Sequence, residues 1–260
     1  MKKITIITLA IIAIISACSG VGKDEFKVTG KLEYGQDAIL YLADFAPMKQ
    51  FTPTDTIRCD KDGRFSFTKK LSKDRLIFIL YSNPDDRIIL IPKRRENIIL
   101  NASYKNLSSS YEIQNSKESV LLKKLKTELD PTNKILVGLS LSLRNTLSSP
   151  LYKERAAQIE EQYNEIEMQQ KGIIKTFLDQ NQGSLSCLVA LYTIFDGHLL
   201  FNPKDDHQIY TSVYKSLDNT FKDNKNVEEL KNFILNADKY KEIEDTTNSI
   251  NSYLNIGEEK

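Results

Sequence analysis

Apolar residues alternate with polar ones over the first third of the chain, residues 26–115, as Phe26 and Val28 illustrate. This period of two is typical of half-buried β-strands. Two denser apolar runs, 76–81 and 88–91, predict strands that are covered on both faces. Turns rich in Gly, Asn and Asp separate seven or eight such segments. The pattern predicts an antiparallel β-sandwich or barrel-like domain.

Residues 116–255 change to the helical period. Leu121, Leu125 and Leu129 share one face of a helix, and Pro131 is expected to end it. Further stripes predict four to six amphipathic helices in total, whose apolar faces must pack on each other or on the sheet. The predicted fold class is therefore α+β, with a β domain followed by a helical region.

Cap and turn signals predict where the later helices begin and end. These signals are Ser149 before Pro150 for a long helix through Phe177, Leu185 to Phe195 for a short helix that ends at Gly197, Asn202 before Pro203 for a third, and Asn226 with Glu229 for the last.

No Gly/Ser-rich or Pro-rich linker separates the two regions. The last predicted strand, 111–113, runs almost directly into a capping-box-like pair, Asn115 and Glu118. The dense runs of the β region need cover, since large exposed apolar patches are rare in soluble monomers. We expect the first helix to dock on the β domain, with Leu125 in the interface.

The N-terminus has the layout of a secretory signal. Two lysines precede an apolar run from Ile4 to Ile15, and the small residues Ser16 and Ala17 lead into Cys18. A run of about 12 residues is shorter than the roughly 20 that a helix needs to cross a bilayer. We expect this segment to be removed rather than to remain as an anchor.

The small pair before Cys18 resembles the lipobox of bacterial lipoproteins, in which the cysteine is acylated and becomes the first residue. The resemblance implies a signal peptide at 1–17, a lipidated tether at 18–25 and membrane attachment through Cys18. It implies a cell-envelope location, on the outer membrane facing the periplasm. The segment 23–25 (Lys-Asp-Glu) also resembles a signal for export to the cell surface. The alternative is a plain secreted protein with an incidental cysteine.

Composition narrows the classes of partner and chemistry. The net charge is +1, so nothing favours nucleic acid as a partner. The two other cysteines, Cys59 and Cys187, form no C-x-x-C pair, which argues against a redox motif or a zinc site. They are expected to be separate buried thiols, although a disulfide between them is the alternative.

The remaining chemical candidates each have an ordinary structural explanation. Residues 60–63 (Asp-Lys-Asp-Gly) resemble part of a calcium loop but lack its distal ligands, and a hairpin turn is expected. The basic stretch 93–95 (Lys-Arg-Arg) is expected to be a solvated turn, with lipid headgroups or a partner as the alternative. The two histidines, His198 and His207, have no metal-site spacing. Ser140, Ser142, Ser184 and Ser186 lie in no nucleophile motif.

Several short segments resemble, in their order, the N-terminal β domain of unknown function found in Bacteroidetes-type lipoproteins. They are 26–32, 39–42, 55–57, 60–67 and 111–113, with a similar helical segment at 177–190. In that family the helical segment precedes a thioredoxin-like thiol–disulfide oxidoreductase domain.

The chain departs from this family in its chemistry. Residues 256–260 resemble the truncated start of the thioredoxin-like domain, but the W-C-x-x-C motif is absent and the chain has no Trp. Oxidoreductase activity is expected only if such a domain continues beyond Lys260. We expect no catalytic residue, cofactor or metal, and a non-catalytic binding or interaction module of unknown ligand. The alternative is the N-terminal part or remnant of an oxidoreductase.

Overall fold

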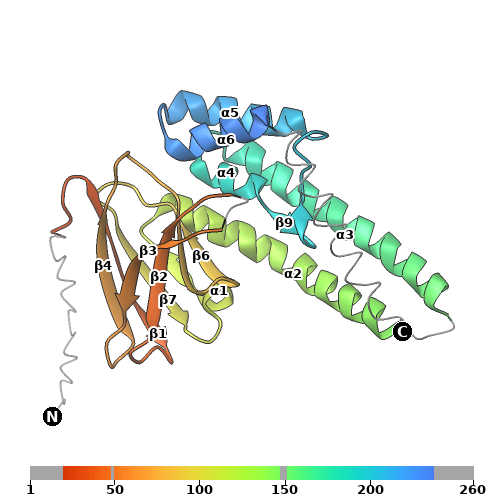
Figure 1. Ribbon diagram of the computed structural model, residues 1–260, viewed down its shortest axis with the longest axis horizontal. Coiled ribbons are helices and arrows are strands. Elements are labelled where there is room, and N and C mark those ends of the chain that lie inside the picture. Colours follow the sequence, from red (N-terminus) through yellow and green to blue (C-terminus); the bar gives the residue numbers. More distant parts are fainter. Residues whose placement is uncertain (1–19, 48–49, 147–150, 237–260) are drawn as a thin grey trace, which may run out of the picture.

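The computed structural model describes residues 20–47, 50–146 and 151–236. It confirms an α+β fold, with two β-sheets followed by a helical region (Figure 1). Cys18, the signal segment 1–17 and residues 256–260 lie outside the described residues, as does the predicted cap at Ser149.

Two four-stranded sheets form the β domain, in the orders β4-β1-β7-β8 and β3-β2-β5-β6. The strands are β1 (Glu25–Glu33), β2 (Ile39–Asp44), β3 (Pro53–Arg58), β4 (Arg64–Lys70), β5 (Phe78–Asn83), β6 (Asp86–Leu90), β7 (Asn97–Ser103) and β8 (Glu112–Gln114). One pair departs from the expected antiparallel pattern, because β1 pairs with β7 in parallel. These strands are far apart in sequence, so no hairpin forces them to run in opposite directions.

The dense apolar strand β5 is covered on both faces, as its sequence predicts. Phe78 and Leu80 lie in the core between the two sheets, where Phe26 also packs. Ile79 and Tyr81 point the other way and lie in a second core shared with the helices. The outer face of this sheet is thus the surface on which the helical region rests.

The helical region contains two long helices and several short elements (Figure 1). A single turn, α1 (Leu107–Ser110), lies within the β domain. The others are α2 (Lys117–Thr146), α3 (Tyr152–Gln180), α4 (Leu185–Leu191), the hairpin β9 (Ile194–Phe195) and β10 (His198–Leu199), α5 (His207–Thr220) and α6 (Lys225–Leu235).

Pro131 does not end its helix, contrary to the prediction, and α2 continues for 15 residues beyond it. An internal proline costs about 3 kcal/mol or more. The buried side chains Leu129 and Leu139 lie on either side of the proline, and α3 supports the same stretch. Gln170 on α3 donates to Thr132 Oγ1 at 3.0 Å. Packing along α3 therefore outweighs the local cost.

Three other predicted helix ends are wrong. Helix α4 ends at Leu191 and not near Phe195, because the positive φ angles of Asp196 and Gly197 turn the chain into the β9–β10 hairpin. Helix α5 begins at His207 and not after Asn202, because the Asn202 side chain accepts two backbone N–H groups in a turn that precedes the helix. Helix α6 is capped at its N-terminus by Asn224 and not by Asn226.

The predicted docking of the helices on the β domain is confirmed. Leu122, Leu125 and Leu129 share one core with Ile77 and Ile79 of the β domain. These apolar contacts make the two regions one packed unit.

Buried polar side chains also cross the joint. Asn226 Oδ1 accepts the Ile77 N–H at 3.2 Å, and its Nδ2 donates to the Phe45 carbonyl at 3.3 Å. Ser119 Oγ accepts the Ile91 N–H at 2.9 Å. The joint is therefore fixed by directional bonds as well as by apolar burial.

Candidate ligand-binding groove

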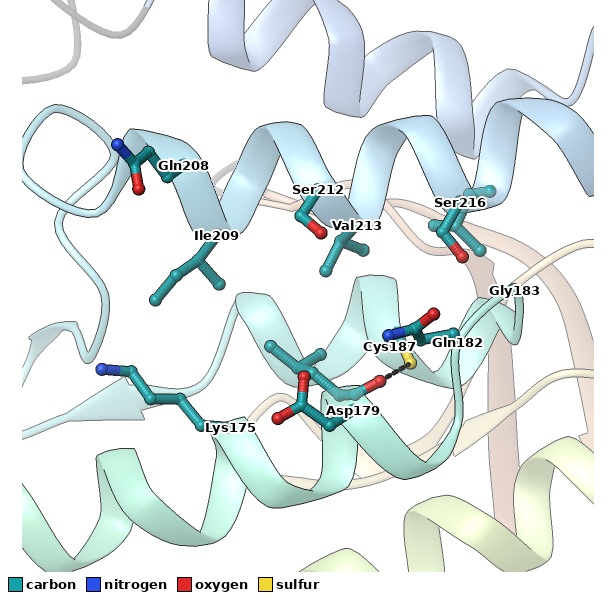
Figure 2. A pocket seen from close by; sticks show the side chains of 12 residues that line it. Lys175, Asp179, Gln182, Gly183, Cys187, Gln208, Ile209, Ser212, Val213 and Ser216 are labelled. Atoms are coloured by element: carbon teal, nitrogen blue, oxygen red, sulfur yellow. Dashed lines mark hydrogen bonds between the residues drawn. The ribbon is translucent and has the colours of Figure 1, made fainter.

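A groove of about 450 Å³ lies between the C-terminal half of α3 and helix α5, with α4 beneath it. Its volume falls in the usual range for small-molecule sites. Figure 2 shows Ile209, Ser212 and Val213 on α5 facing Asp179 on α3 across this space. Two helices that are separate in the sequence thus supply its two walls.

The groove combines an apolar floor with polar walls. Leu178, Cys187 and Leu217 are buried at the floor. The walls carry an ammonium, a carboxylate, amides and hydroxyls, from Lys175, Asp179 and Gln182 on one side and Gln208, Ser212 and Ser216 on the other. This is the usual composition of a ligand site, in which apolar surface gives affinity and a few polar groups fix orientation.

A tight turn between α3 and α4 places the floor against the walls. Gly183 has φ of +76°, and an added Cβ would lie 3.1 Å from Thr220 Oγ1 of α5. A side chain at this position would therefore be both strained and crowded. Ser184 then caps α4 by accepting the Ser186 N–H at 3.2 Å. The glycine and the cap together fold α4 back beneath α3.

The thiol at the floor is not a reactive one. Cys187 is 2% exposed, and its Sγ donates to the Asn181 carbonyl at 3.1 Å. Burial, with a smaller effect of the Glu118 carboxylate, raises the pKa of Cys187 to about 12. Burial also raises the pKa of Cys59, and both are free buried thiols as predicted. A nucleophilic or redox cysteine needs a lowered pKa instead.

A buried ion pair lies behind the groove, and sequence reasoning missed it. Glu118 is 5% exposed and pairs with Arg75 of the β domain at 2.7 Å. Its other oxygen accepts the Ser186 N–H at 3.2 Å and the Ser184 hydroxyl. Glu118 thus joins the β domain to α4. The expected capping box does not form, and Asn115 instead donates to the Asn97 carbonyl.

The other candidates from the sequence lie apart from the groove. Asp60 accepts the Asp62 and Arg64 N–H groups in a tight turn, which joins β3 and β4 of different sheets and is therefore not a hairpin. His198 lies in the β9–β10 hairpin, where its ring packs against Phe195.

The remaining titratable and hydroxyl candidates have local roles. His207 begins α5, with its Nδ1 3.4 Å from Thr211 Oγ1. Ser140 donates to the Leu136 carbonyl within α2, and Ser142 is exposed. Within the described ranges, no group of three or more His, Cys, Asp or Glu side chains could hold a metal ion. No helix in the described part of the chain is long and apolar enough to span a membrane.

The fold and the groove define an α+β protein in which a β-sandwich carries a helical region with a ligand-sized groove. Residues 26–122 match the model of a family described as a domain of unknown function, DUF4369. This match confirms the β-domain part of the resemblance seen in the sequence. No curated protein and no solved structure gives a significant match.

Proposed function

We propose that this chain is a non-catalytic binding module of the cell envelope, anchored to the membrane through a lipid on Cys18. Its ligand is held in the groove between α3 and α5. The composition of that groove carries the proposal, because an apolar floor lies between two facing rows of hydrogen-bonding side chains. The anchor is supported by the small residues that precede Cys18 after a short apolar run.

The charges of the groove favour a ligand that is neutral overall and amphipathic. Lys175 and Asp179 contribute one charge of each sign, one helical turn apart on α3. Amides and hydroxyls on Gln182, Gln208 and Ser212 supply the other polar contacts. Such a wall suits a molecule with an apolar part and several hydrogen-bonding groups, such as a short peptide. The raised pKa of Cys187 supports a binding role over thiol chemistry.

The experiment is a thermal-shift screen of short amphipathic peptides and other neutral amphiphiles against wild type and a groove-filling variant, Ser212→Phe. A matched control is Asp218→Phe, which adds the same ring to an exposed position of α5 that does not line the groove. A ligand at about 100 times its Kd stabilises the native state by about 2.7 kcal/mol.

A ligand that stabilises wild type and Asp218→Phe, but not Ser212→Phe, is the expected result. Equal stabilisation of all three proteins would place the ligand elsewhere and would contradict the proposed site.

A further inference from the structure

Four chain segments meet at one end of the molecule, the end at which β1 begins. They are residues 20–25, 70–75, 93–96 and 222–225, which we call the basic end; it lies at the upper left of Figure 1. Backbone hydrogen bonds join them: Leu71 N–H to the Asp24 carbonyl at 2.8 Å, and Arg95 N–H to the Glu25 carbonyl at 2.6 Å. The Asn224 side chain donates to the Arg75 carbonyl at 2.8 Å. The basic end is therefore an ordered surface.

Positive side chains dominate the exposed part of this surface. The exposed basic residues are Lys23, Lys70, Lys73, Lys93, Arg95, Lys222 and Lys225, and the exposed acidic residues are Asp24, Asp74 and Asp223.

Some of the acidic charge at the basic end is already neutralised. Asp24 pairs with Arg94 at 3.3 Å. Asp44, at the edge of the surface, pairs with Lys225. The outward charge is positive although the whole chain has a net charge of only +1.

Arg95 holds an unusual backbone conformation in the basic turn. Its φ is +66°, a region that glycine enters freely and a long side chain does not. Glycine would adopt this turn conformation at a lower steric cost than arginine. Strained backbone of this kind is often found at functional sites, so the arginine side chain is the part of this residue to explain.

We propose that the basic end contacts the anionic phospholipid headgroups of the membrane that carries the chain. The described structure begins at Gly20, two residues after Cys18, and the chain enters β1 from this end. A lipid on Cys18 would hold the basic end close to the bilayer, because each residue spans at most about 3.6 Å. Basic side chains near an anionic membrane surface are attracted to it. The orientation of the basic end towards the bilayer rests on the proposed lipid anchor at Cys18. The attraction of its basic side chains to anionic headgroups does not depend on that anchor.

The test measures sedimentation of residues 20–260, a chain without Cys18, with vesicles. This chain retains every described contact, and its binding does not depend on acylation. The vesicles contain phosphatidylglycerol and phosphatidylcholine in equal parts, or phosphatidylcholine alone, at about 0.1 M salt, where charges act over about 10 Å.

The test variant is Lys93→Gln with Arg95→Gly. Glycine at position 95 relieves the positive φ, so reduced binding could not be attributed to an unfolded turn. The matched control is Lys61→Gln with Lys105→Gln, which removes the same charge. Lys61 and Lys105 lie in exposed turns at the far ends of β1 and β7.

Wild type should bind the anionic vesicles and not the phosphatidylcholine vesicles. Each basic residue at the surface contributes about fivefold to affinity, so the test variant, which lacks two of them, should bind about 25-fold more weakly. The control should bind like wild type. Equal binding to both vesicle types, no binding to either, or equal losses in the two variants would overturn the proposal. A finding that Cys18 is not acylated would instead concern only the anchor.

Discussion

The side chain of Asn226 offers the sharpest test of how the helices are fixed to the β domain. It is 1% exposed and bonds to two backbone groups of the β domain, the Ile77 N–H and the Phe45 carbonyl. Asn226→Ala removes both partners and leaves these two buried groups without an alternative partner from the substituted side chain. The methyl group of alanine can neither accept a hydrogen bond from the N–H nor donate one to the carbonyl.

The expected loss of stability follows from these two groups. A buried polar group that loses its partner costs about 1–3 kcal/mol. We expect Asn226→Ala to lower the free energy of unfolding by about 3 kcal/mol, since some relaxation around alanine offsets the upper limit. In a protein of this size each kcal/mol lowers Tm by about 2–4 °C, so the shift is about 6–12 °C.

Urea and thermal unfolding of residues 20–260 measure the effect. Asn232→Ala, an exposed position on the same helix, is the matched control and should stay within about 0.5 kcal/mol of wild type. If Asn226→Ala also stays within that range, Asn226 does not hold the joint, and our account of the docking fails.

Three further changes test separate parts of the structure. Gly30→Ala should prevent stable folding, as a melting curve would show, because an added Cβ would lie 1.6 Å from the Leu100 carbonyl oxygen; a normal melting curve would refute this. Burial raises the pKa of Cys187 from 9.0 to about 12, so wild type should lose stability relative to Cys187→Ala as the pH rises from 9 towards 12, because the unfolded thiol releases its proton first. Parallel curves across that range would contradict it. Cys18→Ser in the full chain should abolish lipid labelling and release the protein from the membrane fraction; a variant that is still processed and membrane-bound would rule out the lipid anchor.

Much of the fold follows from the hydrophobic period alone. The alternation in β1 and the dense run of β5 predict strands with one and two covered faces, and both are observed. Helix ends are harder to predict, because they depend on partners distant in sequence. Pro131 lies inside α2 only because α3 supports the stretch around it.

The groove could not be predicted from the sequence. Lys175, Asp179 and Ser212 have the spacing of ordinary solvated helix faces, and α3 and α5 become neighbours only through α4. The one local signal is Gly183, whose positive φ begins the turn under α3. The Arg75–Glu118 pair was missed for the same reason, since its partners are 43 residues apart.

Native mass spectrometry of the chain purified from its own cells tests the binding function most directly. Wild type should carry a small amphipathic molecule, and Ser212→Phe should lack it, because the added ring occupies the groove between α3 and α5. Asp218→Phe should carry the same molecule as wild type. Identical spectra for wild type and Ser212→Phe would contradict the proposal that this groove is the ligand site.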